Sequence, residues 1–423
     1  MHMSKKKKEY TPELRFVEFR NKMHWTTKKI GSITQVTAGA TPNTSNPEYW
    51  GGEIPWMNSG ELNLKRVFEV SNRITEKGLT ETSTKLVPVG SILIGLAGQG
   101  KTRGTAAINY IELCTNQSIA SIHPNKDNFV NEFMFQQMDS LYLFLRSLSK
   151  GEGGRGGLNL SIIKSVEVFL PSIPEQNKIA DCLASIDELI TLHTQKLDAL
   201  KAHKKGLMQQ LFPAEGESVP KLRFPEFNNA GPWELKPIGK VLTEKQRSMD
   251  MEDDAEYSLV TVKRRYGGLV SRGIYKGKSI KVKSQFEIHE NDFLISKRQI
   301  VHCACGVVPK ELHGSIVSNE YSVLVPIKGN DVHFFDHFAQ QPAVSLSFLQ
   351  CSIGIVIEKM LFKLKDWLKE KFLFPELDEQ QKIAQFLGDF DEIIDKQIQK
   401  IESLKEHKKG LVQKLFPFMD EVV

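Results

Sequence analysis

Apolar residues recur in alternating steps of three and four along two long stretches of this chain, within 171–213 and 375–417. Such spacing places apolar side chains along one stripe of an α-helix, and a stripe kept over about five heptads is typical of a coiled-coil seam. We therefore predict two long helices, each stopped by a Phe-Pro pair. The seam residues are Ile179, Leu183, Ile186, Ile190, His193, Leu197, Leu200, Lys204, Leu207 and Leu211 in the first helix, and Ile383, Leu387, Phe390, Ile394, Gln397, Ile401, Leu404, Lys408, Leu411 and Leu415 in the second.

The two helical stretches are copies of each other. Pro171 returns as Pro375 and Pro213 as Pro417, an offset of 204 in both cases. A second repeat, with an offset of 208, opens each half of the chain. Its matched residues include Pro12, Leu14, Arg15, Phe16, Glu18, Phe19 and Trp25, which return as Pro220, Leu222, Arg223, Phe224, Glu226, Phe227 and Trp233. The regions between the repeated pieces look unrelated, so the chain is a tandem duplication in which two globular inserts have diverged.

This organisation predicts a fold of the α/β (α+β) class, with two globular domains and two long helices. Two equal helices in one chain most simply pair with each other, and we expect an antiparallel pair with a pseudo-twofold axis. His193 and Gln397 interrupt the two seams at the same place, so we expect them to lie close together. The alternative is that each helix packs on its own domain. The expected segments are a basic N-terminal arm at 1–11, a domain at 12–170, a helix at 171–213, a linker at 214–219, a domain at 220–374 and a helix at 375–417.

Composition narrows the function only slightly. The chain has 56 basic and 51 acidic residues, a net charge of +5, which permits but does not require a polyanionic partner. No apolar run is long enough to cross a membrane, and no cleavable leader is apparent. Five scattered cysteines favour reduced thiols, so we expect a cytoplasmic protein.

Residues 95–102 match the phosphate-binding loop pattern G-x-x-x-x-G-K-[ST]. A nucleotide site of this type needs a helix directly after the loop, to receive the phosphate. Here Arg103-Gly-Thr leads instead into Ala106–Ile111, a strand-like run. The equivalent place in the other half, after Asp292–Ile295, has Ser-Lys-Arg-Gln and no glycine loop. Nucleotide binding stays a minor alternative, and we interpret the segment as a strand followed by a variable loop.

Several polar side chains at strand ends or in loops are candidates for contacts with DNA bases and phosphates. The alternative for each cluster is an ordinary solvated charged surface with no binding role. The candidates are Lys65, Arg66, Gln99, Lys101, Arg103 and Arg155 in the first half, and Lys263, Arg264, Arg265, Tyr266, Lys297, Arg298 and Gln299 in the second.

A metal site and catalytic histidines are weak alternatives. His302, Cys303 and Cys305, with His333 and His337 further along the chain, have irregular spacing for structural zinc, so we interpret them as ordinary histidines and buried thiols, with no metal bound. His203 and His407 stand late in the two helices beside lysines, and we expect interface or capping roles there.

Each long helix carries Glu-Gln, then Lys-Ile-Ala, and ends in Lys-Lys-Gly-Leu and Leu-Phe-Pro. Together with Leu-Arg-Phe…Glu-Phe…Trp…Ile-Gly at the start of each half, this pattern resembles the specificity subunits of type I restriction–modification systems. The resemblance covers essentially the whole chain. It implies that residues 12–170 and 220–374 are target-recognition domains, each reading one half of a split site in double-stranded DNA. The residues expected in the helix pair or at partner subunits are Glu175, Gln176, His193, Lys204, Glu379, Gln380, Gln397 and Lys408.

The same resemblance implies a non-catalytic chain. Its helices would set the spacing and dock two modification subunits, which bring S-adenosylmethionine and methylate adenine, while separate motor subunits bring ATP hydrolysis and cleavage. This chain would hold no cofactor itself. A built-in adenine methyltransferase is disfavoured, because its Pro-Pro motif has no counterpart here. A coiled-coil adaptor fits the two large domains poorly, and a subunit of a related methylation-dependent system remains an alternative.

Overall fold

The computed structural model describes residues 10–98, 100–148 and 157–417 of the chain. The chain divides into two compact units, each mixing helices and strands as predicted. Unit 1 comprises Met1–Thr194 and Lys400–Val423, and unit 2 comprises Gln195–Gln399. Each long helix therefore contributes one part to each unit.

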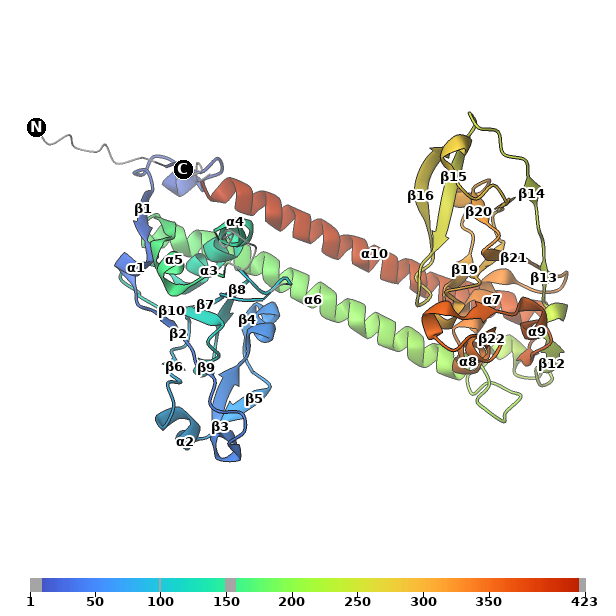
Figure 1. Cartoon of the computed structure of the whole chain (residues 1–423), viewed down its shortest axis with the longest axis horizontal. Coiled ribbons are helices and arrows are strands. Elements are labelled where there is room, and N and C mark those ends of the chain that lie inside the picture. Colours follow the sequence, from blue (N-terminus) through green and yellow to red (C-terminus); the bar gives the residue numbers. More distant parts are fainter. Residues whose placement is uncertain (1–9, 99, 149–156, 418–423) are drawn as a thin grey trace, which may run out of the picture. The chain divides into compact units, whose positions relative to one another are not determined.

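Unit 1 is built on two small sheets, drawn in blue and cyan in Figure 1. One has the order β2-β10-β7-β8-β4, the other has the order β5-β3-β9-β6, and β1 pairs with β11 separately. The strands are β1 (Thr26–Lys29), β2 (Val36–Ala38), β3 (Trp50–Met57), β4 (Arg66–Val67), β5 (Asn72–Ile74), β6 (Leu86–Val87), β7 (Ile92–Gly95), β8 (Ala106–Asn109), β9 (Leu113–Thr115), β10 (Ile119–Ile122) and β11 (Glu167–Leu170). The helices are α1 (Ile30–Ile33), α2 (Glu76–Thr80), α3 (Asn131–Ser140), α4 (Tyr142–Ser147) and α5 (Leu160–Ser165).

The apolar run at β7 forms a fully buried strand at the centre of a unit 1 sheet. All four residues of β7 are buried, and so are all four of β8 and of β10, its two neighbours in the sheet. A strand covered on both faces has no polar side to present, which is why its sequence is continuously apolar. Helix α3 adds Met134, Phe135 and Met138 to the same core.

Unit 2 contains a four-stranded sheet of order β13-β21-β18-β19 and a five-stranded sheet of order β14-β17-β20-β15-β16. Strands β12 and β24 pair separately, as do β22 and β23. The strands are β12 (Glu234–Pro237), β13 (Leu242–Glu244), β14 (Ser248–Met249), β15 (Glu256–Val262), β16 (Leu269–Lys276), β17 (Gln285–Glu287), β18 (Phe293–Ser296), β19 (Cys305–Val307), β20 (Ile316–Ser318), β21 (Tyr321–Pro326), β22 (Ser352–Ile353), β23 (Leu361–Phe362) and β24 (Lys371–Phe374). The helices are α7 (Val332–Ala339), α8 (Pro342–Gln350) and α9 (Leu364–Trp367).

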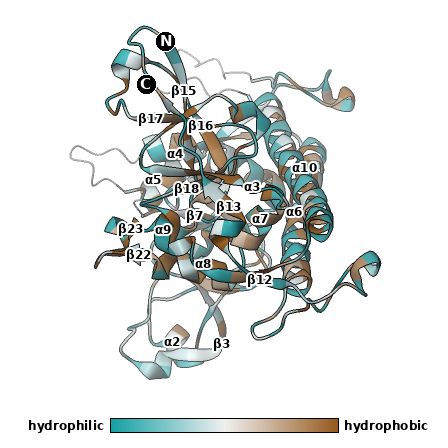
Figure 2. Cartoon of the chain, turned by 90° about the vertical axis from the view of Figure 1, so that its right-hand side faces the viewer, coloured by the Kyte–Doolittle hydropathy of each residue, from teal (hydrophilic) through white to brown (hydrophobic). Residues whose placement is uncertain are grey.

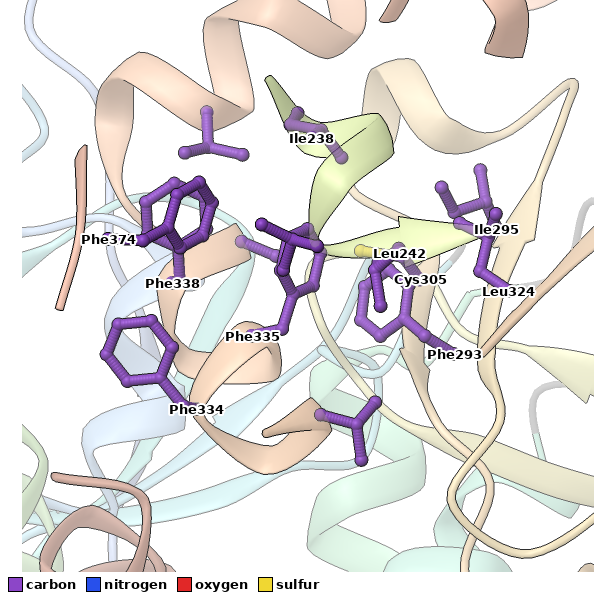
Figure 3. Packing of buried hydrophobic residues seen from close by; sticks show 14 of the residues in the cluster. Ile238, Leu242, Phe293, Ile295, Cys305, Leu324, Phe334, Phe335, Phe338 and Phe374 are labelled. Carbon is purple, nitrogen blue, oxygen red and sulfur yellow. The ribbon is translucent and has the colours of Figure 1, made fainter. Parts of the chain in front are cut away.

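The core of unit 2 is rich in aromatic rings. Figure 3 shows Phe335 and Phe338 of α7 among the buried side chains of the surrounding strands. The ring centroids of Phe338 and Phe374 lie 4.7 Å apart, and those of Phe335 and Phe293 lie 5.1 Å apart, edge to face. These separations fall in the range that aromatic pairs prefer, so α7 is firmly anchored on the sheet.

The two long helices are α6 (Ile173–Leu211) and α10 (Leu377–Leu415). Their predicted seam residues are buried or half-buried, whereas most intervening positions are exposed. Figure 2 shows the matching alternation of hydrophilic and hydrophobic ribbon along both helices. The seam assignment is therefore confirmed, and each predicted range extends only two residues beyond the observed helix at either end.

Within each unit, the two helices run antiparallel. In unit 1, Lys408 near the end of α10 pairs with Asp187 near the start of α6 at 2.7 Å. In unit 2, Lys204 near the end of α6 pairs with Asp391 near the start of α10. The two ion pairs are copies of each other under the 204-residue offset, so the antiparallel arrangement with an internal repeat is confirmed. The proximity of His193 and Gln397 stays a prediction, because these residues belong to different units.

In each unit, an arginine and a tryptophan of the repeated opening motif form hydrogen bonds to a glutamate at the start of a long helix. Arg15 donates two hydrogen bonds to the Glu175 carboxylate, at 2.7 and 2.9 Å, and the Trp25 indole donates a third at 3.2 Å. In unit 2, Arg223 and Trp233 hold Glu379 in the same way. Because these arginines and glutamates are at most 7% exposed, their charges are satisfied inside each unit.

Gln176 and Gln380 are equally internal. Gln176 accepts from the backbone N–H of Val130 and donates to the carbonyl of Pro171, and both of its partners lie in unit 1. Gln380 accepts from the N–H of Asp331 in unit 2. The Glu-Gln pair of each helix, predicted as a helix-pair or partner-subunit feature, thus fastens a globular domain to its helix. Among the residues that the structure describes, no helix is long and apolar enough to cross a membrane.

Candidate DNA interface

The loop that matched a phosphate-binding pattern connects two antiparallel strands. Strand β7 ends at Gly95, and the chain returns along it as β8, with Leu93 opposite Ala107. The predicted strand after the loop is therefore confirmed, and no helix begins where a nucleotide phosphate would need one. This geometry removes the basis for the nucleotide-binding alternative.

Side chains of helix α4 form hydrogen bonds to the backbone of the β7–β8 loop. Arg146 donates to the carbonyl of Gly100 at 2.7 Å, and the Tyr142 hydroxyl donates to the carbonyl of Lys101 at 3.3 Å. The Lys101 side chain is exposed and forms no ion pair with a carboxylate in the described part of the chain. Arg103 is half-buried in the same loop. Two other candidates, Gln99 and Arg155, lie outside the described residues.

The corresponding loop of unit 2 lies between β18 and β19. Strand β18 follows β7 by 201 residues and also forms an antiparallel hairpin, with Leu294 opposite Gly306. The predicted equivalence of the two strands is thereby confirmed. In this loop Lys297 donates to the carbonyl of Asn319 at 2.8 Å, and Arg298 pairs with Glu320 at 2.6 Å.

The structure brings the two basic clusters of unit 2 together. Arg264, in the turn between β15 and β16, donates to the side-chain oxygen of Gln299 at 2.8 Å. Lys263, Arg264 and Arg265 are exposed, and none of the three pairs with a carboxylate among the described residues. A polar surface that joins one turn to the β18–β19 loop therefore carries basic side chains available to a nucleic acid.

Tyr266 points the other way. Its hydroxyl donates to the carbonyl of Ala339 and also contacts Ser345, and burial raises its pKa above the ordinary value. The backbone φ of Arg265 and Tyr266 is positive, 58° and 54°, so this tight turn directs Arg265 outward while Tyr266 anchors it.

Lys65 and Arg66 are engaged inside unit 1. Lys65 pairs with Asp139 at 2.5 Å, and Arg66 forms two bonds of 2.6 Å to Glu132. Arg66 also donates to Asp187 of α6 at 3.0 Å. Burial works to lower the pKa of Arg66, but the Glu132 carboxylate outweighs it and the pKa is raised. The pairing gives Arg66 a role in joining the strand β4 to α3 and α6.

The histidine–cysteine cluster has ordinary partners. His302 lies 3.0 Å from the Glu358 carboxylate, and Cys305 is buried in the unit 2 core. Within residues 10–98, 100–148 and 157–417, no group of three or more His, Cys, Asp or Glu is arranged to hold a metal ion. His203 packs edge-on against Phe390, with ring centroids 5.4 Å apart, so it takes part in the helix pairing within unit 2.

Sequence reasoning missed the strand β16. Six consecutive residues of β16 are exposed, including Arg272, Ile274 and Lys276. β16 is the edge strand of the five-stranded sheet and pairs with β15, and paired strands of this kind are an element that the major groove of DNA admits. The available signal was the run Ser-Arg-Gly-Ile-Tyr-Lys-Gly-Lys at 271–278, which is basic and lacks a buried face.

Comparison with known proteins points to one family. The family model described as "Type I restriction modification DNA specificity domain" matches residues 22–202 and 231–406. The chain is 32% identical over 229 residues to the type I restriction enzyme MjaIX specificity subunit of Methanocaldococcus jannaschii, covering 52% of this chain and 51% of that protein. It is 26% identical over 201 residues to the EcoR124I/EcoR124II specificity subunit of Escherichia coli, covering 47% and 49%. The chain thus spans about half the length of the curated relatives it matches.

Solved structures share the fold across nearly the whole chain. An S subunit of a type I restriction–modification system from M. genitalium aligns over 97% of this chain and 100% of its own, with a TM-score of 0.58 and 15% identity. A chain from a structure on complex assembly and conformational transition of the type I restriction–modification system aligns over 93% and 97%, with a TM-score of 0.54 and 14% identity.

Proposed function

The chain belongs to the family of type I restriction–modification DNA specificity domains, and from this premise we propose that it is the non-catalytic DNA-specificity subunit of such a system. Each unit reads one half of a bipartite site in double-stranded DNA. The observation that carries the proposal is the pair of equivalent hairpin loops, β7–β8 and β18–β19, one on each copy of the duplicated scaffold.

The charges on these loops support contact with DNA. Lys101 in unit 1 and Lys263, Arg264 and Arg265 in unit 2 are exposed without a carboxylate partner among the described residues. Such cations gain most from phosphate, because no internal ion pair has to be broken first. Gln299, already oriented by Arg264, has the amide group that reads adenine in the major groove.

We assign the chemistry to partner subunits. The long helices would dock two modification subunits, which bring S-adenosylmethionine and methylate adenine, and restriction subunits with ATP-driven activity would join the complex. The two 39-residue helices would determine the number of unread base pairs between the half-sites. In this proposal the chain binds no cofactor, and it acts in the cytoplasm, where the host DNA lies.

A domain exchange tests the proposal. Residues 220–374 are replaced by the corresponding region of another specificity subunit, the chimera is expressed with its modification subunit, and methylated adenines are mapped by sequencing. We expect one half of the bipartite motif to change and the other half to persist. A motif that changes in both halves contradicts separate reading. Replacing only the linker 214–219 is the matched control, and it should leave the motif intact.

A further inference from the structure

A cavity of about 410 Å³ lies within unit 2 between α7 and α10. Asp336 and His337 line it from α7, and Gly388 and Asp391 line it from α10. Among the described residues, no lysine or arginine lines the cavity. It is distinct from the loops assigned above to DNA.

The charges around this cavity are not balanced within the described residues. Lys204 pairs with Asp391, whereas no lysine or arginine of the described chain pairs with Asp336. Burial and the neighbouring Asp391 carboxylate raise the pKa of Asp336 to about 6. Asp331 also lines the cavity, so three carboxyl groups lie around it, and Lys204 pairs with one of them, that of Asp391.

His337 adds an unsatisfied polar atom. The residue is 5% exposed and its Nδ1 has no hydrogen-bond partner in the described structure. Its Nε2 lies 3.9 Å from Asp391, too far for a hydrogen bond. Burial, assisted by Lys204 and His333, lowers its pKa to about 3, so the ring is neutral. Buried polar atoms are normally bonded, so this nitrogen, in a residue that lines the cavity, is an exception among the described residues.

Unit 1, the other copy of the duplicated scaffold, has a site equivalent to this cavity. Val130 and Asp331 donate to the glutamines of the repeated Glu-Gln pair, which aligns α3 with α7 at an offset of 201. Under this offset Glu132, Phe135 and Gln136 of α3 correspond to His333, Asp336 and His337 of α7. Asp187 corresponds to Asp391 under the helix offset of 204.

In unit 1 that place holds the guanidinium group of Arg66. It is bonded to Glu132 and Asp187, and it lies over the ring of Phe135, with its central carbon 5.2 Å from the ring centroid. Gln136 completes the arrangement by donating to Asp187 at 2.8 Å. Glu132, Phe135, Gln136 and Asp187 map onto residues that line the unit 2 cavity, whereas Tyr110, whose hydroxyl accepts from Arg66 at 2.8 Å, has no counterpart in that lining.

Unit 2 supplies no such cation of its own. In unit 1, Arg66 stands opposite Ile108 of β8. On the corresponding strand β19, Val307 has the position of Ile108, and the start of β16 lies beside this strand: a Cβ on the adjacent Gly306 would lie 3.2 Å from Leu269 and 3.8 Å from the Asp336 carboxylate. Among the described residues, no lysine or arginine pairs with Asp336 there.

We propose that the cavity is a socket for an arginine side chain of a partner protein, which takes the place that Arg66 occupies in unit 1. The guanidinium group bridges Asp336 and Asp391, as Arg66 bridges Glu132 and Asp187. A planar fork with several donors suits two carboxylates better than a compact ammonium group does. Only the identity of the partner, a subunit of the modification complex, rests on the proposed function.

The socket is tested on the isolated full-length chain with ethylguanidinium chloride as the probe. Binding is followed through the ring ¹³C and ¹⁵N resonances of His337 and through the melting temperature, with ethylammonium and magnesium chlorides at matched ionic strength for comparison. We expect saturable binding of ethylguanidinium in the millimolar range, and at least tenfold weaker binding of the other two cations.

Two variants localise the binding. Asp336→Asn removes the carboxylate with little change of shape, and Gly388→Met fills the cavity while leaving both carboxylates in place. Each should weaken binding at least tenfold. Glu392→Gln, which removes an exposed carboxylate paired with Lys396 on the same helix, is the matched control and should bind as the parent does. Arg66→Ala opens the equivalent site in unit 1, so ethylguanidinium should restore part of that variant's lost stability.

Three results would overturn the socket: no saturable effect on His337, equal binding in Asp336→Asn, or equal binding of magnesium or ethylammonium. Because the assay contains no DNA, failure to read a bipartite site would leave this result unaffected, and the reverse also holds.

Discussion

The Arg15–Glu175 ion pair should be among the most sensitive points of unit 1. Replacing Arg15 by Met leaves the Glu175 carboxylate, 1% exposed, with the indole N–H of Trp25 at 3.2 Å as its one remaining side-chain donor among the described residues. It also removes the donors to the carbonyls of Lys22 and Met23. Removing one partner of a buried ion pair typically costs about 3–5 kcal/mol, because the other charge stays desolvated. We expect a loss in this range for unit 1.

Hydrogen exchange resolved by peptide is the appropriate assay, because a chain of two units need not unfold in one step. Arg15→Met should speed exchange in residues 10–29 and at the start of α6, and leave unit 2 unchanged. The equivalent Arg223→Met should do the reverse. Lys22→Met, in an exposed side chain of the same segment, is the control and should alter stability by less than about 0.5 kcal/mol.

A double variant separates the lost charge from lost packing. Arg15→Met combined with Glu175→Leu removes both charges, so no buried carboxylate is left without a partner. Because apolar replacement of a whole buried pair is often neutral, we expect most of the stability to return. If the double variant is as unstable as Arg15→Met alone, the desolvated carboxylate is not the cause and the reasoning is refuted.

Three further predictions concern the Asp336 carboxyl group, the Lys101 side chain and the length of the two long helices. Asp336→Asn should stabilise unit 2 by about 1–2 kcal/mol at pH 8. A rise of the folded-state pKa from 3.8 to about 6 corresponds to about 3 kcal/mol, which we halve because the Asp336 side chain is only half-buried. Since the penalty of ionisation is absent below pH 4 and complete above pH 6, the two proteins should have equal stability in urea titrations near pH 4; a constant difference would contradict the assigned pKa. Lys101→Ala should lower the slope of log affinity for DNA against log salt concentration by about 1, whereas Lys77→Ala, already paired with Glu48, should not; equal slopes in binding titrations would count against Lys101 as a phosphate contact. One heptad inserted at equivalent points of α6 and α10 should change the spacer of the methylated motif, and an unchanged spacer in methylation maps would argue against the helices as its determinant.

The sequence alone determined the parts that depend on periodicity and repetition. A 3.5-residue spacing admits only a helix with one apolar stripe, so α6 and α10 were predicted to within two residues. Duplication with constant offsets required two similar units, and a continuous apolar run required the buried strand β7. The sequence also disfavoured a nucleotide loop at 95–102, because the segment after it lacks a helical pattern, and the β7–β8 hairpin then removed the basis for that alternative.

Tertiary structure decided what each polar side chain does. The sequence alone does not distinguish the basic residues Lys65, Arg66, Lys101 and Lys263. In the fold, carboxylates from distant segments pair with Lys65 and Arg66, whereas Lys101 and Lys263 stay exposed. Such pairings depend on contacts more than sixty residues apart in the chain, for example the 66 residues that separate Arg66 from Glu132. Tertiary structure also decided that the Arg66 site of unit 1 corresponds to the cavity of unit 2. The equivalence of Phe135 and Asp336 follows from the matching hydrogen bonds that join α3 to α6 and α7 to α10.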